Sequence, residues 1–124
     1  MLVVPAERRL HHRDDDHLLR FASESGGGWV PKTVDAQTRC GDYCSLAFDV
    51  NGVPAVAYRE LETHAGYSLR NLKYAHRQGV SWATEVVASN GDIGLYNTLR
   101  FGPNGKAALF TYSASDSRIY LFQK

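Results

Sequence analysis

The chain repeats itself with a period of 53 residues. Residues 1–57 align with residues 54–110 without a single gap, so that Trp29 recurs as Trp82 and Asn51-Gly52 recurs as Asn104-Gly105. A repeat of this length is typical of architectures in which one supersecondary unit cannot bury its apolar face alone and must stack on a neighbour. The sequence therefore predicts stacked copies of one unit.

Large apolar and aromatic residues recur at the same place in each copy. Because such residues usually pack one unit against the next, we expect them to form the repeated core, although tryptophan and tyrosine rings could instead stack on sugars. The set comprises Trp29, Trp82, Tyr43, Tyr96, Leu46, Leu99, Phe48 and Phe101.

Each period contains four short strand-like runs separated by turn residues, and no stretch of helical periodicity competes with them. Counting along the chain predicts groups of three, four and three strands, about ten in all, joined by connections short enough for antiparallel neighbours. Asn-Gly supplies the positive φ of a two-residue type I′ hairpin. The two Asn-Gly pairs therefore predict hairpins that join 45–50 to 54–60 and 97–101 to 107–112.

One full period shows the runs Ser-Leu-Ala-Phe-Asp-x2-Gly-x-Pro-x-Val-Ala-Tyr at 45–58, Leu-Lys-Tyr-Ala at 72–75 and Gly-x2-Trp at 79–82. This order resembles the propeller-blade repeat of many bacterial secreted and surface proteins, and more distantly the sialidase-type Asp-box repeat. The resemblance implies an all-β, antiparallel propeller-like fold in a single domain, residues 1–124. The blades would be a partial one at 1–35, a full one at 36–88 and a partial one at 89–124.

About two and a half blades leave edges and faces uncovered. The resemblance therefore implies an incomplete propeller that is completed by oligomerisation, with a homodimer as the simplest case. The alternative is a closed ten-stranded up-and-down barrel, which the strand count permits but which does not account for the duplication. A further alternative is an incomplete propeller fragment without activity of its own.

Charge and hydropathy exclude several partners. The 14 Lys and Arg nearly balance the 13 Asp and Glu, so no long-range field attracts nucleic acid or an anionic membrane. No stretch approaches the roughly 20 apolar residues that span a bilayer. The first residues show no signal-peptide pattern, although the resembling proteins are mostly exported, so the compartment stays open.

The connections at 7–17 and 60–70 are longer than the equivalent 113–117, and extended loops on a rigid scaffold are where binding usually occurs. We expect a non-catalytic binding or scaffold module, with a glycan as the ligand class that the resemblance suggests. Donors, acceptors and one ring face for such a ligand come from His11, Asp14, His17, His64, Tyr67 and Arg70.

The alternative function is a metal-dependent enzyme that uses the loop from His11 to His17, with His11, Asp14, Asp16 and His17 as ligands. No phosphate-binding loop or nucleophile motif supports enzyme activity, and we predict no cofactor. Sialidase activity is not implied, because the Ser and Asp positions of the Asp-box are Ala22 and Glu24 in one copy and Ala75 and Arg77 in the other.

Cys40 and Cys44 are the only cysteines, and neither recurs. Two cysteines without nearby His or Cys partners are a poor zinc signal, because a closed structural site needs four ligands. A disulfide and two free thiols both remain open.

Overall fold

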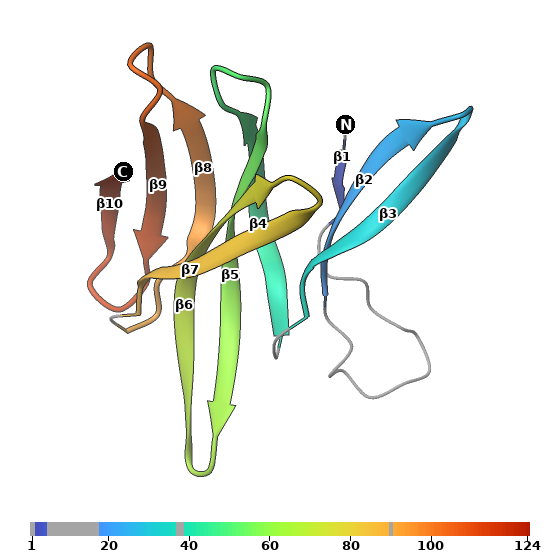
Figure 1. Ribbon diagram of the computed structural model, residues 1–124. Helices are drawn as coiled ribbons and strands as arrows, with labels where there is room; N and C mark the ends of the chain where they lie inside the picture. Colours follow the sequence, from blue (N-terminus) through green and yellow to red (C-terminus); the bar gives the residue numbers. More distant parts are fainter. Residues whose placement is uncertain (1, 5–17, 37–38, 90) are drawn as a thin grey trace.

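The computed structural model describes residues 2–4, 18–36, 39–89 and 91–124, and these residues form antiparallel β-strands joined by turns and short connections (Figure 1). None of them belongs to a helix that could cross a membrane. The strands are β1 (Leu2–Val4), β2 (Leu19–Ser25), β3 (Gly28–Asp35), β4 (Arg39–Phe48), β5 (Pro54–His64), β6 (Tyr67–Gln78), β7 (Ser81–Ala88), β8 (Leu95–Phe101), β9 (Ala107–Ser113) and β10 (Arg118–Gln123).

The strands form three separate sheets in chain order: β1-β2-β3, β4-β5-β6-β7 and β8-β9-β10, here called the first, second and third sheets. The predicted all-β class and the grouping of three, four and three strands are confirmed. The closed ten-stranded barrel is wrong, because β3 does not pair with β4 and β7 does not pair with β8. At both places the chain crosses to a new sheet.

The second sheet is covered on both faces (Figure 1). Successive side chains of a strand point to opposite faces, so Val56 and Tyr58 of β5 pack toward the first sheet and Ala55 and Ala57 toward the third. The core between the first and second sheets contains Leu19, Phe21, Val34, Cys40, Val56, Tyr58 and Ala75. The core between the second and third contains Ala55, Ala57, Leu72, Tyr74, Ile93, Leu99, Ala107 and Leu109.

The two Asn-Gly hairpins differ from the prediction. Gly52 has φ 79°, whereas Asn51 is not among the residues with positive φ, so the turn is not type I′. Asp49 N donates to Val53 O and Gly52 N to Asp49 O, both at 2.9 Å, which closes a three-residue loop with glycine in the left-handed position. The Asp49 carboxylate supports this loop, since its Oδ1 accepts the N–H groups of Asn51 and Val53 at 2.9 Å each. The second hairpin closes in the same way between Gly102 and Lys106 without a carboxylate at the equivalent position, so the loop type does not depend on Asp49.

The extended connection at 60–70 is a β-hairpin and not a loop. β5 continues to His64 and β6 begins at Tyr67, so only Ala65 and Gly66 form the turn. Figure 1 shows this hairpin projecting beyond the other strands at one end of the sheets. The connection 7–17 lies outside the described residues.

The recurring core residues do not all lie in a core. Leu99 is buried, and Leu46, Phe101 and Trp82 are partly buried against the two cores. The other four, Trp29, Tyr43, Phe48 and Tyr96, are exposed in the single chain, Trp29 by 54%. The physical reason for Trp29 is that Trp82 packs on the sheet that precedes its own, and no described sheet precedes the first one.

Candidate functional site

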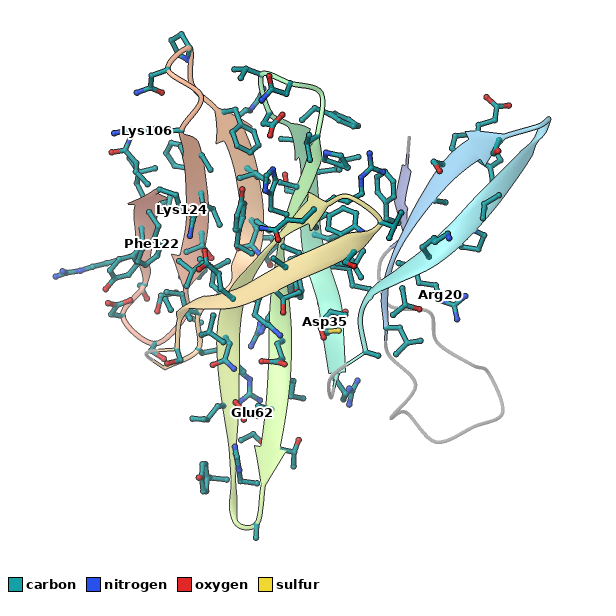
Figure 2. All side chains as sticks on the ribbon, viewed as in Figure 1. Arg20, Asp35, Glu62, Lys106, Phe122 and Lys124 are labelled. Carbon is teal, nitrogen blue, oxygen red and sulfur yellow. The ribbon has the colours of Figure 1, made fainter. Side chains whose placement is uncertain are left out.

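A cluster of charged side chains is buried where the first sheet meets the second. Lys73 of β6 reaches the carboxylates of Asp35 on β3 and Glu60 on β5, with its Nζ at 2.6 Å from Asp35 Oδ2 and 3.3 Å from Glu60 Oε2. Tyr58 also donates its hydroxyl to Asp35 Oδ2 at 2.6 Å, and Asn71 donates Nδ2 to Glu60 Oε1 at 2.9 Å. Figure 2 shows Asp35 at this junction. We call Asp35, Tyr58, Glu60 and Lys73 the junction quartet.

Burial and charge act against each other in the junction quartet. Desolvation alone would lower the pKa of Lys73, but the hydrogen bond and charge of Asp35 and the charge of Glu60 outweigh it, and the net pKa is raised. Desolvation, followed by the hydrogen bond to Asp35, raises the pKa of Tyr58. Lys73 is therefore a cation and Tyr58 a neutral phenol near neutral pH, so the quartet serves as a structural ion cluster.

Cys40 lies beside the junction quartet, and its Sγ donates to Asp35 O at 3.2 Å. Burial, reinforced by the charge of Asp35, raises the pKa of this thiol to about 12. Cys40 and Cys44 are both free thiols. Of the two possibilities open from the sequence, the structure has the pair of free thiols.

The repeat places positions equivalent to the junction quartet at the boundary between the second and third sheets, and different residues occupy them. Ala88, Thr111 and Ser113 stand 53 positions after Asp35, Tyr58 and Glu60. The strand registers give the fourth equivalence, because Lys73 lies opposite Tyr58 and Tyr120 lies opposite Thr111. Small neutral side chains thus replace two carboxylates and a tyrosine.

A cavity of about 560 Å³ opens at this second junction. Its lining combines apolar side chains with hydroxyl groups and the carboxylate of Asp116. The Tyr120 hydroxyl donates to Asp116 Oδ2, and this bond lowers the pKa of Asp116, so the carboxylate is ionised at neutral pH. The lining residues are Val87, Ala88, Ser89, Gly91, Ile93, Ser113, Ser115, Asp116, Tyr120 and Phe122.

The cavity rim is held by polar contacts between the second and third sheets. The backbone N–H of Asp92 donates to Ser115 Oγ at 2.6 Å, and the Asp92 carboxylate pairs with Arg59. Arg70 Nε lies 3.7 Å from the same carboxylate. The arginines of the projecting hairpin therefore fix the segment that forms one side of the cavity.

The structure brings three of the six predicted ligand-binding residues onto one hairpin. His64 and Tyr67 stack their rings at the tip, with centroids 4.8 Å apart, and Arg70 Nε lies 3.7 Å from the carboxylate of Asp92, whose neighbours Gly91 and Ile93 line the cavity. His11, Asp14 and His17, together with Asp16 of the alternative metal site, lie outside the described residues. Among the residues that are described, no three His, Cys, Asp or Glu side chains gather as metal ligands.

Sequence reasoning missed Asp116 and Tyr120, and it missed the junction quartet. The available signal was the failure of the repeat: Asp35 becomes Ala88 although the preceding Val34 recurs as Val87, and Glu60 becomes Ser113. In a duplicated scaffold, such positions are where the two junctions differ in chemistry. Comparison with protein-family models, curated proteins and solved structures finds no match, so the site is interpreted from its own geometry.

Proposed function

We propose that this chain is a non-catalytic scaffold of propeller-like blades, which associates with further copies and presents the end of its sheets for binding. The observation that carries the proposal is one contact between sheets within the chain. Trp82 of the second sheet packs on Phe21 of the first, with ring centroids 5.3 Å apart, and the Arg77 guanidinium lies over the Phe21 ring, 5.7 Å from its centroid.

Each outer sheet has a residue at the repeat position of one side of this contact. Trp29 occupies in the first sheet the repeat position of Trp82. In the second sheet Tyr74, the repeat equivalent of Phe21, lies opposite Ala57. In the third sheet Leu121 lies opposite Phe110, the repeat equivalent of Ala57. Leu121 therefore holds the position of Phe21 and Tyr74. Trp29 of a second copy placed on Leu121 would therefore repeat the contact that Trp82 makes with Phe21.

The outer face of the third sheet is suited to such burial. Ile119 is 74% exposed, and Phe110 and Leu121 are also exposed beside it. A hollow of about 400 Å³ on this face is lined by Tyr96, Thr98, Phe110, Thr111, Tyr112 and Ile119. Contiguous apolar surface of this kind marks interaction sites on soluble proteins.

The association is head-to-tail, because the two faces differ from each other. A heterologous contact of this kind closes into a ring when the rotation between copies permits, and a dimer is the smallest closed case. A ring places the projecting β5–β6 hairpins of all copies on the same side. Weak single sites would then gain affinity through multivalency.

The experiment compares Trp29→Ala with Trp82→Ala by light scattering and urea unfolding. Trp29→Ala should convert the assembly to monomer, while the free energy of unfolding of the single chain changes by less than about 1 kcal/mol. Trp82→Ala removes a ring packed inside the chain and should lower the free energy of unfolding by about 3 kcal/mol. An assembly that survives Trp29→Ala would contradict the proposed interface.

The ligand class that the resemblance suggests is carbohydrate, and the hairpin residues His64 and Tyr67 offer an exposed ring face for it. A glycan array with the assembled protein tests this part. Binding should be lost in Tyr67→Ala. Binding that is unchanged in Tyr67→Ala and in His64→Ala would remove the hairpin tip from the site.

A further inference from the structure

The cavity at the second junction is a feature of one chain and does not depend on assembly. It lies where the first junction is filled by the junction quartet, and its volume of about 560 Å³ falls within the range of small-molecule sites. The space exists because Ala88 and Ser113 are shorter than Asp35 and Glu60, and because Tyr120 lines the wall instead of crossing it as Lys73 does.

The polar groups of the cavity define the chemistry of an occupant. Among the described lining residues, the polar side chains are three serines, Tyr120 and Asp116, and no arginine, lysine or histidine is present. Hydroxyls donate and accept, whereas an ionised carboxylate only accepts. A ligand rich in hydroxyl donors is matched to this set, and an anion would face Asp116 without a counter-charge.

The apolar groups define the shape of the occupant. Val87, Ala88 and Ile93 line the cavity together with the stacked rings of Tyr120 and Phe122, whose centroids lie 6.1 Å apart. Figure 2 shows Phe122 on the third sheet. Ring faces pack against apolar C–H surface, so a compact ring with polar edges matches this lining.

We propose that this cavity binds a neutral saccharide, one or two sugar rings in size, with Asp116 accepting its hydroxyl donors. The site differs from the hairpin tip of the proposed function, and it is complete within a single chain. Its test therefore uses the protein in whatever assembly state it has, and the result is independent of the outcome for Trp29.

The measurement is a titration of the protein with neutral methyl glycosides and their disaccharides, followed by NMR chemical shifts of the backbone amides. Saturable millimolar or tighter binding should shift the amides of residues 87–93 and 113–122. The matching uronic acids should bind at least about tenfold more weakly, because their carboxylate meets Asp116.

Three variants locate the site. Ala88→Phe fills the cavity and should abolish binding, whereas Ala83→Phe places the same ring on an exposed position of the same strand and should leave binding unchanged. Asp116→Asn replaces an exposed side chain, leaves the fold intact and should weaken binding about tenfold or more.

Several results would overturn the inference. One is the absence of saturable shifts with every neutral saccharide, and another is equal binding by wild type and Asp116→Asn. Binding of methylammonium in the cavity, without binding of any neutral sugar, would assign the site to a small organic cation instead. Shifts restricted to residues 64–67 would place the sugar at the hairpin tip.

Discussion

Lys73 is the residue on which the junction between the first and second sheets depends most. Its ammonium lies between two carboxylates from two different sheets, in a place where all three side chains are almost completely buried. A buried ion pair is weak evidence for net stability, but removing one partner leaves an uncompensated buried charge. The cluster therefore fixes how the sheets meet more than it stabilises them.

Lys73→Met keeps a similar volume and removes the charge. Because Asp35 and Glu60 then face each other without the ammonium between them, the free energy of unfolding should fall by about 3 to 5 kcal/mol. Lys32→Met, at an exposed position of β3, is the control and should change it by less than about 0.5 kcal/mol. Equal effects of the two substitutions in urea unfolding would contradict a structural role for the cluster.

The buried groups Lys73, Cys40 and Tyr58 determine how the free energy of unfolding depends on pH. The pKa of Lys73 is raised on folding. Its contribution to the free energy of unfolding is therefore present below the pKa of the unfolded state and is lost as pH rises through the pKa of the folded state. The pKa values of Cys40 and Tyr58 are also raised, and because the unfolded forms ionise first, folding is again disfavoured at high pH.

All three groups act in the same direction. The free energy of unfolding should be nearly constant up to about pH 9 and then fall, by about 1.4 kcal/mol per pH unit for each group titrating. Urea unfolding between pH 7 and about pH 11 measures this. A free energy of unfolding that is constant or increases above pH 9 would show that these groups are not buried as described.

At the scale of the strands, much of the fold could be predicted from the sequence. Alternation of side chains locates β5, and the repeat extends that assignment to β9. The turn type could not be predicted, because Asn-Gly also fits a three-residue loop in which only the glycine has positive φ, and both hairpins adopt that loop. The full hairpin at 60–70 was also missed, since its polar residues resemble a loop.

Gly52 tests the observed loop. Its φ is 79° and a Cβ at this position would meet no atom within 4 Å, so the cost of a side chain comes from the backbone alone. Gly52→Ala should lower the free energy of unfolding by about 1 kcal/mol, and Gly52→Asn by less, because asparagine tolerates the left-handed conformation. Thermal unfolding that ranks alanine as the milder substitution would contradict the loop.

At the scale of the whole molecule, the repeat predicts that sheets stack but does not say which junctions are filled and which are open. That difference arises from pairs of residues on different sheets, such as Asp35 with Lys73, and their equivalents Ala88 and Tyr120. Neither the cavity nor the exposure of Trp29 is visible in a single period. The outer faces become interpretable only when the contact between Trp82 and Phe21 is known.

The outer sheets of separate copies should bind each other as the sheets within one chain do. Sedimentation equilibrium of the unmodified chain at micromolar concentration measures this association. We expect a single species with a mass of at least twice 13.8 kDa and a whole-number multiple of it, which dissociates when Trp29 is replaced by alanine. A stable monomer of 13.8 kDa across the whole concentration range would contradict it.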